Sequence, residues 1–220
     1  MLFSYKIFLT GNLASIPNLN EKYTTATSKA ETIVIWGSSK ETDSILKSMN
    51  LCSKTTKDLI SQGYNILTGC GSNGIMGSAY KSAAKYSNKD IKTQKPTQNL
   101  AIVVEPAWGD EDINNCIAIG KAQSETDRIE KFRKTADTFV IFPGSATTIQ
   151  EAATIIQKNE YSSGDEPLKK IILVGKDFFS GLNEQYQKLF EYKLLKHSPK
   201  DLFTIADTEE EILGIVNSTH

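Results

Sequence analysis

Three segments rich in glycine, serine and threonine could together bind an anionic ligand. They comprise residues 37–39, 69–77 and 143–151, with the sequences GSS, GCGSNGIMG and PGSATTIQE. Each segment follows a short apolar run and precedes an amphipathic stretch, which places it between a strand and a helix. Small residues at such a turn let a ligand approach the backbone, and the first N–H groups of the helix point toward that ligand. The three segments therefore predict a site for a phosphate group.

The residues of these segments that could contact a ligand are small, or carry a hydroxyl or amide group. They are Gly37, Ser38, Ser39, Gly71, Ser72, Asn73, Gly74, Gly144, Ser145, Ala146, Thr147 and Thr148. Short polar residues at a strand-to-helix turn also serve simply as helix N-caps. From the residues alone, ligand contact and capping both remain open for Ser38, Ser39, Ser72 and Asn73.

The few histidines and cysteines disfavour nucleophilic catalysis and metal binding. Histidine occurs only at His197 and His220, which removes most Ser-His-Asp and Cys-His schemes. Cys52, Cys70 and Cys116 form no CxxC pair, so neither a disulfide framework nor a zinc site is predicted. We expect no metal, no cofactor and a cytoplasmic location, with chemistry that depends on carboxylates, arginine and backbone amides.

Length and charge limit the class of protein further. The chain has 220 residues, with 25 Lys and Arg against 26 Asp and Glu, for a formal net charge of -1. Such a balance argues against electrostatic capture of nucleic acid or of an anionic membrane. No apolar run reaches the roughly 18 to 20 residues of a membrane-spanning helix. We expect a single globular domain over residues 31–220, preceded by an N-terminal arm over residues 1–30 whose structure the sequence does not assign.

Short apolar runs alternate with amphipathic stretches at the spacing of successive strands and helices. Strands are predicted at Thr32–Trp36, Asn65–Thr68, Leu100–Val104, Thr138–Phe142 and Lys170–Val174, with a weaker one at Leu202–Ile205. Helices are predicted at Asp43–Gln62, Asn73–Tyr86, Glu125–Thr135, Thr148–Asn159, Phe178–Leu195 and Glu209–Asn217. Most of the strands are apolar throughout, as strands covered on both faces require. The fold class is therefore α/β, a Rossmann-like doubly wound parallel sheet with helices on both faces.

The order of these motifs resembles the LOG ("lonely guy") family, many of whose members have been labelled lysine decarboxylases. The resemblance covers about residues 32–213 and rests on GSS, TGCGSNGIMG, an arginine-bearing helix and FPGSATTIQE. Its most specific element is the family pattern PGGxGTxxE, here residues 143–151. The resemblance implies a Rossmann-like fold, a homodimer, and phosphoribohydrolase activity that cuts nucleoside 5′-monophosphates such as AMP to free base and ribose 5-phosphate. It also implies catalytic roles for Arg128 and Glu151, which match the arginine and glutamate of the family motifs.

The sequence departs from the family pattern at several positions near these motifs. Ser145 and Thr147 stand where the second and third motif glycines are expected, and Ile129 replaces the lysine that follows the arginine. Cys70 interrupts a GGG, and Thr68 replaces a common tyrosine. If the replaced glycines need positive φ, Ser145 and Thr147 would be strained and the loop would change shape.

The chemistry of the two charged residues can be argued from general principles. Cleavage of an N-glycosidic bond passes through an oxocarbenium-like state, which a fixed carboxylate such as Glu151 would stabilise. Arg128 would pair with phosphate or ribose hydroxyls and would help keep Glu151 ionised. Structural roles remain open for both: Thr148-x-x-Glu151 also fits a capping box, and Arg128 could be a solvated arginine paired with Glu125.

Three function classes remain. The first is a nucleoside-monophosphate phosphoribohydrolase, which requires Arg128 and Glu151 to face one pocket. The second is a non-catalytic binder or sensor of a nucleotide, which the altered loop and Ile129 would suit. The third is lysine decarboxylation, which usually needs a cofactor such as pyridoxal phosphate, and for which the sequence offers no site.

Overall fold

The computed structural model describes residues 31–87, 97–104, 116–163 and 167–218. The expected N-terminal arm, residues 1–30, lies outside the described residues. The elements, in chain order, are β1 (Thr32–Trp36), η2 (Asp43–Ile45), α2 (Leu46–Ser61), β2 (Asn65–Thr68), α3 (Gly74–Tyr86), β3 (Asn99–Val104), β4 (Ile117–Ala122), α4 (Glu125–Thr135), β5 (Thr138–Ile141), α5 (Ala146–Glu160), β6 (Lys170–Val174), α6 (Lys176–Glu191), α7 (Pro199–Leu202), β7 (Thr204–Ala206) and α8 (Glu209–Asn217).

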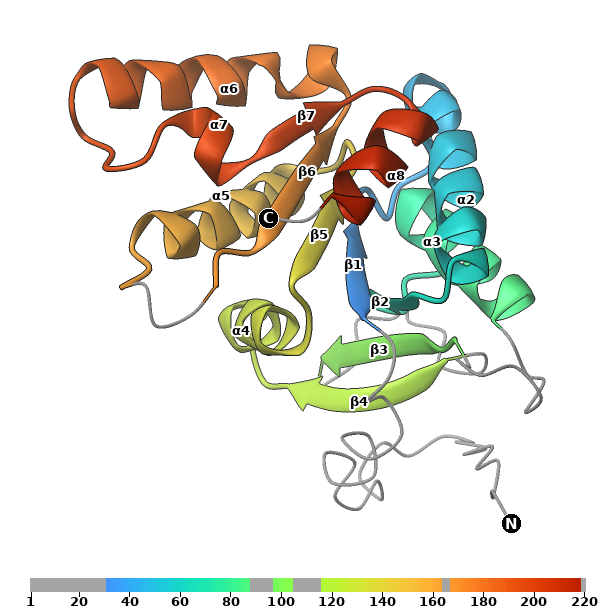
Figure 1. Ribbon diagram of the computed structural model, residues 1–220. Helices are drawn as coiled ribbons and strands as arrows, with labels where there is room; N and C mark the ends of the chain where they lie inside the picture. Colours follow the sequence, from blue (N-terminus) through green and yellow to red (C-terminus); the bar gives the residue numbers. More distant parts are fainter. Residues whose placement is uncertain (1–30, 88–96, 105–115, 164–166, 219–220) are drawn as a thin grey trace.

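The strands of the described chain form one seven-stranded sheet in the order β4-β3-β2-β1-β5-β6-β7 (Figure 1). Every neighbouring pair is parallel. The chain moves outward from β1 through β2 and β3 to β4, and then returns to the other side of β1 with β5. The order therefore reverses between β1 and β5, and ligands of doubly wound sheets bind in the crevice at such a point.

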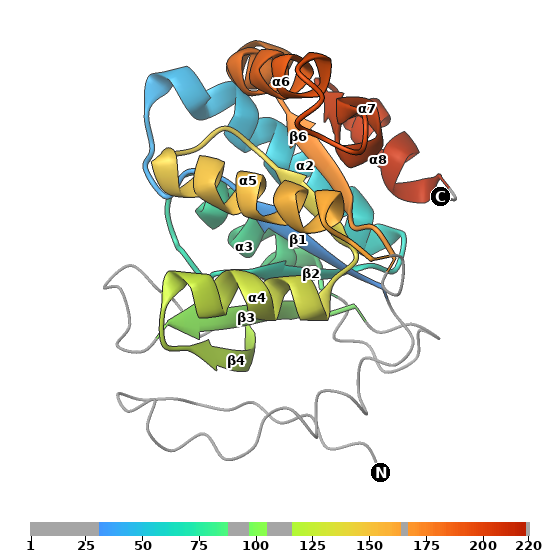
Figure 2. The same ribbon diagram turned by 90° about the vertical axis from the view of Figure 1, so that its left-hand side faces the viewer.

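Helices cover both faces of the sheet, as the apolar strands predict. Side chains of α4, α5, α6 and α7 pack with one face around Trp36 and Phe139, and those of α2, α3 and α8 pack with the other around Ile33 and Ile35. Figure 2 shows α4 and α5 lying in front of the strands. The α/β doubly wound prediction is confirmed, and both helix layers meet the sheet in continuous apolar cores.

The predicted elements differ from the structure at the two edges of the sheet. β4 was not predicted, because it is an edge strand whose residues Ile117 and Lys121 are not buried, so its sequence lacks a continuous apolar run. The weak strand at Leu202–Ile205 is wrong in part, since the chain there ends the short helix α7 before β7 begins at Thr204. Edge strands carry weaker sequence signals because one side of each faces no neighbouring strand.

Helix ends agree with the sequence where capping residues mark them. Ser124 accepts a hydrogen bond from the Asp127 N–H at the start of α4, and Gly63, at φ 98°, follows the C-terminus of α2. The helix predicted at Thr148–Asn159 instead begins at Ala146, two residues earlier. That shift changes the turn on which Glu151 lies.

Candidate functional site

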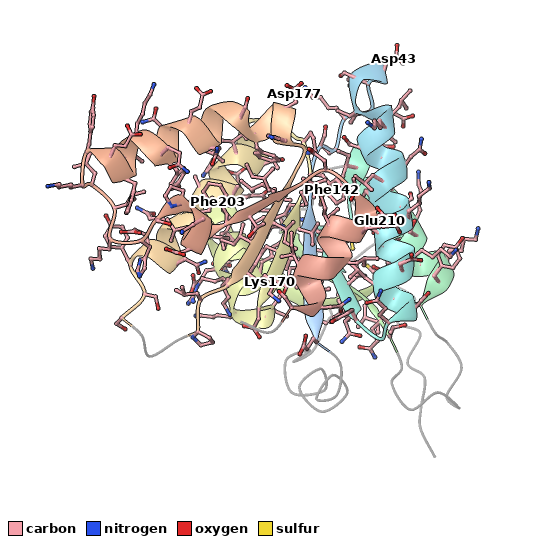
Figure 3. All side chains as sticks on the ribbon, turned by 45° about the horizontal axis from the view of Figure 1, so that its top comes forward. Asp43, Phe142, Lys170, Asp177, Phe203 and Glu210 are labelled. Carbon is pink, nitrogen blue, oxygen red and sulfur yellow. The ribbon has the colours of Figure 1, made fainter. Side chains whose placement is uncertain are left out.

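A cavity of about 360 Å³ lies at the carboxyl ends of β1, β2 and β5, where the strand order reverses. Figure 3 shows this end of the sheet, where Asp43, Phe142 and Asp177 lie, with Lys170 at the opposite end of the strands. The described residues that line the cavity are Gly37, Ser39, Gly69, Gly71, Met76, Glu125, Arg128, Ser145, Thr147, Thr148 and Glu151. All three glycine-rich segments therefore contribute to one cavity.

Backbone hydrogen bonds hold the segments after β1 and β5 together. Phe142 N–H donates to the Trp36 carbonyl oxygen at 2.9 Å, and Ser38 N–H donates to the Pro143 carbonyl oxygen at 3.0 Å. The Ser38 carbonyl oxygen in turn accepts from Met76 N–H of α3 at 3.2 Å. The loops are thus fixed by backbone hydrogen bonds, and Ser39 lines the cavity next to them.

Six of the predicted ligand-binding residues do not line the cavity: Ser38, Ser72, Asn73, Gly74, Gly144 and Ala146. Ser38 folds back instead, donating its hydroxyl to the Lys40 carbonyl oxygen at 3.0 Å. Gly74 begins α3 at φ 60°, and a Cβ there would lie 2.5 Å from the Ser38 carbonyl oxygen. Asn73 is the N-cap residue of α3, without a capping bond from its side chain. These positions shape the loops that support the cavity.

The N-terminus of α5 points into the cavity. Its N-cap residue, Ser145, makes no capping bond with its side chain, and its carbonyl oxygen accepts from Ile149 N–H at 3.2 Å. The N–H groups of the first helical residues, Ala146 to Thr148, have no acceptor within the helix by their position. Three hydroxyl-bearing residues of this turn, Ser145, Thr147 and Thr148, line the cavity.

The expected strain at Ser145 and Thr147 is absent. Ser145 adopts φ -78° and ψ -176°, which is extended backbone, and Thr147 is helical. The positive φ occurs instead at Cys70, at 60°, in the segment after β2. The replaced glycines thus leave the third segment unstrained, and the left-handed residues Cys70 and Gly74 lie in the second segment.

Arg128 is a buried residue of the cavity wall, and its side chain bonds to the backbone of β3 and of the loop after β2. Its side chain donates from Nε to the Ile102 carbonyl oxygen at 3.1 Å and from Nη2 to the Gly69 carbonyl oxygen at 2.9 Å. Only 8% of the residue is exposed. The alternative of a solvated arginine is therefore wrong, and two of its donors are committed to protein carbonyls rather than to a ligand.

Position 69 requires glycine because the Arg128 guanidinium lies against its backbone. A Cβ at Gly69 would overlap the Nη2 atom of Arg128. The pairing of β2 with β3 sets Thr68 beside Ala101, so Gly69 and Ile102 follow side by side. The guanidinium thus donates hydrogen bonds to two neighbouring carbonyl groups at the point where the chain leaves β2 and separates from β3.

Glu151 lies on the second turn of α5, not on its first turn as predicted. Because α5 begins at Ala146, Thr148 is inside the helix and buried, so the predicted capping box between Thr148 and Glu151 is not formed. No described residue hydrogen-bonds to the Glu151 carboxylate. The side chain lines the cavity together with Arg128 and Glu125.

Burial raises the pKa of Glu151 from 4.5 to about 7. The nearby Arg128 guanidinium acts in the opposite direction and lowers this pKa, whereas the Glu125 carboxylate raises it. Desolvation is the largest of these effects, as expected when a carboxylate leaves water without hydrogen-bond donors. Arg128 therefore favours the ionised form, as predicted, yet Glu151 is only about half ionised at neutral pH.

Glu125, Gly69 and Met76 line the cavity but were not among the predicted site residues. Glu125 is the first residue of α4, which follows β4 after a short connecting segment. Because β4 lacks the apolar run of a buried strand, its sequence does not mark the junction at which Glu125 lies. Met76 is an apolar residue of α3, and its residue type gives no sign that it lies at the cavity wall rather than in the core.

Within the described part of the chain, no three His, Cys, Asp or Glu side chains lie close enough to hold a metal ion. None of the helices described is both long and apolar enough to span a membrane.

Comparison with known proteins gives one family and several related structures. A family model described as "Possible lysine decarboxylase" matches residues 74–216. No curated protein matches the sequence. A molybdenum cofactor binding protein from the phototrophic bacterium Rippkaea orientalis superimposes with a TM-score of 0.57 at 17% identity, covering 86% of this chain and 96% of that one.

Two further solved structures have the same fold. The molybdenum cofactor carrier protein from Chlamydomonas reinhardtii has a TM-score of 0.58 at 15% identity and covers 86% of this chain and 96% of its own. DNA processing protein A from Helicobacter pylori has a TM-score of 0.53 at 13% identity and covers 88% of this chain and 83% of its own. Because the sequence identities are below 20%, these similarities show a shared fold and nothing about function.

Removal of the Arg128 guanidinium should destabilise the protein strongly. R128M keeps much of the apolar stem but leaves the Ile102 and Gly69 carbonyl oxygens without their donors, at a cost of about 2–4 kcal/mol in free energy of unfolding. R133M makes the same exchange on the same helix, where Arg133 pairs with Glu130 at 2.9 Å, and should cost about 1 kcal/mol or less. Urea denaturation measures both; equal losses would contradict the structural role given to Arg128.

The raised pKa of Glu151 should make stability depend on pH. Because the folded pKa exceeds the unfolded one, the folded state binds more protons between pH 4.5 and about 7, so stability falls as pH rises through this interval. E151Q removes the effect and should be about 1–3 kcal/mol more stable than wild type at pH 8, with no such advantage below pH 4.5. E184Q, the same exchange at an exposed residue of α6, should behave as wild type at both pH values. Parallel stability curves for E151Q and wild type would contradict the assignment.

Proposed function

This chain belongs to the family described as possible lysine decarboxylases, the family of the LOG resemblance, and from its site we propose that it hydrolyses the N-glycosidic bond of nucleoside 5′-monophosphates. The products would be the free base and ribose 5-phosphate. AMP is the simplest substrate of this class. We further propose, from the family resemblance and the cysteine usage, that the protein acts as a homodimer in the cytoplasm.

One observation carries the proposal: Glu151, which accepts no hydrogen bond from a described residue, lines the same cavity as the N-terminus of its own helix. A carboxylate that serves only structure would be expected to accept hydrogen bonds from its surroundings. Glu151 is instead half-buried and lies beside an open volume of about 360 Å³. This arrangement supports a role toward a bound molecule.

The N-terminus of α5 would hold the phosphate group. Unpaired N–H groups and the positive end of the helix dipole favour an anion there, and the hydroxyls of Ser145, Thr147 and Thr148 add further donors at the cavity wall. Glu151 follows Thr147 by four residues, or about 6 Å along the helix axis. A 5′-phosphate at the helix start would therefore place the ribose near the Glu151 carboxylate.

Glu151 would act in its ionised form. Positive charge develops at the anomeric carbon as the bond to the base breaks, and a fixed carboxylate in a partly dry cavity stabilises that charge and orients the attacking water. With a pKa raised to about 7, the residue also accepts a proton from this water near neutral pH. Activity should accordingly rise with pH through this range.

Arg128 would act as a positioning residue in this mechanism. Its bonds to the Ile102 and Gly69 carbonyl oxygens fix the loop after β2 against the cavity. Its positive charge lowers the pKa of Glu151 and so maintains an ionised fraction at neutral pH. The sequence-based role of Arg128 in holding phosphate is replaced by support of the loop and of the carboxylate.

A non-catalytic nucleotide carrier or sensor is the second candidate. The commitment of two Arg128 donors to backbone carbonyls favours it, since these donors do not face a reacting group. Two of the structures with the same fold are named as a binding protein and a carrier protein for the molybdenum cofactor. Thermal stabilisation by a nucleotide without turnover would identify this alternative.

Lysine decarboxylation, the activity in the family description, has no support in the site. A pyridoxal phosphate enzyme needs a lysine for the Schiff base, and no lysine lines the cavity among the described residues. The residues present do not fit that cofactor.

The E151Q variant tests the hydrolase proposal. Loss of the carboxylate should lower base release from nucleoside 5′-monophosphates by about 100-fold or more, with nucleotide binding nearly unchanged. Chromatography of the free base measures turnover, and thermal shift with the same nucleotides measures binding. Wild-type kcat/KM should rise with pH around an apparent pKa near 7.

E125Q is the matched control, because Glu125 is the other carboxylate of the cavity. Its loss removes a charge that raises the pKa of Glu151, so turnover should persist with the pH profile moved to lower pH. Unchanged turnover in E151Q would remove Glu151 from the mechanism, and binding without turnover in the wild type would establish the carrier alternative.

A further inference from the structure

Two cysteines that are distant in sequence meet beside the cavity. The Sγ atoms of Cys70 and Cys116 lie 2.6 Å apart. The two residues are 46 positions apart in the chain, with β3 between them. Sequence spacing alone gave no reason to pair them, because only the fold of the sheet brings them together.

Cys70 belongs to the loop that forms the cavity wall. It lies between Gly69 and Gly71, both of which line the cavity. Its backbone is held at φ 60°, and its N–H donates to Thr68 Oγ1 at 3.2 Å. Residues other than glycine rarely adopt such a φ, and they keep this conformation only when the surrounding structure holds it in place.

The side chain of Cys70 is fully buried and points away from the cavity. It packs in a small cluster with Tyr80, Ala101 and Val103, and Cys116, the residue before β4, packs against this cluster. Cys116 is only partly buried. The pair therefore has one accessible sulfur and one protected sulfur.

Cys52 provides a contrast within the same protein. It is buried between α2 and α3, where its thiol donates to the Ile75 carbonyl oxygen at 3.7 Å. Burial raises its pKa to about 12, so the reactive thiolate form is scarce. Cys52 belongs to the core cluster on the α2 and α3 face of the sheet, whereas Cys70 belongs to a separate small cluster.

We propose that Cys70 and Cys116 form a reversible disulfide that fixes the loop after β2 at the cavity. The inference concerns a modification site and does not rest on the proposed hydrolase function. It requires little movement of the backbone, since the sulfurs are already closer than atoms in ordinary nonbonded contact.

The reaction can be written with a peroxide as the oxidant. The Cys116 thiolate attacks one oxygen of hydrogen peroxide, the O–O bond breaks, and a sulfenic acid forms, while the departing hydroxide takes up a proton from solvent and becomes water. The Cys70 thiol then attacks the Cys116 sulfur, so that the S–S bond forms and a second water leaves. A dithiol reverses the reaction by exchange and is itself oxidised to a disulfide.

The disulfide would act on the cavity through the backbone of Gly69 and Gly71. The Gly69 carbonyl oxygen is an acceptor for Arg128, which in turn influences the ionisation of Glu151. A covalent link from Cys70 to the start of β4 would limit the opening of this loop. The oxidised protein should therefore have a more rigid cavity wall than the reduced protein.

The test is controlled oxidation of the folded full-length protein with hydrogen peroxide. We expect an intact mass lower by about 2 Da, from the two hydrogens lost in forming the disulfide, and a linked peptide pair containing Cys70 and Cys116. The oxidised protein should melt several degrees higher, and amide hydrogen exchange should slow over residues 69–72. Addition of dithiothreitol should reverse all these changes.

C52S is the matched control and should form the same disulfide, whereas C116S and C70S should not. A monomer on a non-reducing gel distinguishes the internal bond from links between chains. The proposal is overturned if the linked peptide is missing after oxidation, if Cys52 is part of the link, or if the disulfide forms without slowing exchange over residues 69–72.

Discussion

Arg128 donates from Nε to the Ile102 carbonyl oxygen and from Nη2 to the Gly69 carbonyl oxygen, and thereby joins α4 to β3 and to the loop after β2. A buried guanidinium is costly unless its donors are satisfied, so its position is fixed by these two carbonyls. The contact requires glycine at position 69, because a Cβ there would overlap the guanidinium. Arg128 also places a positive charge at the wall of the cavity that Glu151 lines. The shape of the loop and the ionisation of the carboxylate both depend on this one side chain.

Three effects decide the ionisation of Glu151. Burial is the largest and disfavours its charge, Glu125 acts in the same direction, and Arg128 favours the charge, so that the pKa rises to about 7. A carboxylate that is close to half ionised at neutral pH can exchange a proton with water at little cost, which suits acid–base chemistry. Burial of the ionised Glu151 carboxylate also lowers the stability of the folded protein, and such a loss is common at functional sites. Glu151 accepts no hydrogen bond from the described residues that would offset this cost.

The sequence predicted the centre of the sheet well and its edges poorly. β1 and β2 have the predicted bounds because their apolar runs end at glycine-rich turns, whereas β4 was missed because its half-exposed edge position lacks such a run. Glu125, at the junction after β4, was missed for the same reason. The role of Arg128 could not be predicted either, because it depends on the pairing of β2 with β3. That pairing places the Gly69 and Ile102 carbonyl groups beside the guanidinium. The approach of Cys70 to Cys116 likewise depends on three-dimensional packing, which local patterns do not encode.

The central claim is that a nucleotide binds with its phosphate at the start of α5 and its N-glycosidic bond beside Glu151. A crystal structure of the E151Q variant with bound AMP tests this claim most directly, because the variant should bind the substrate without cleaving it. We predict the phosphate against the N–H groups of Ala146 to Thr148 and the anomeric carbon next to the side chain of residue 151. AMP bound in the reverse orientation, or at a site away from this cavity, would contradict the account.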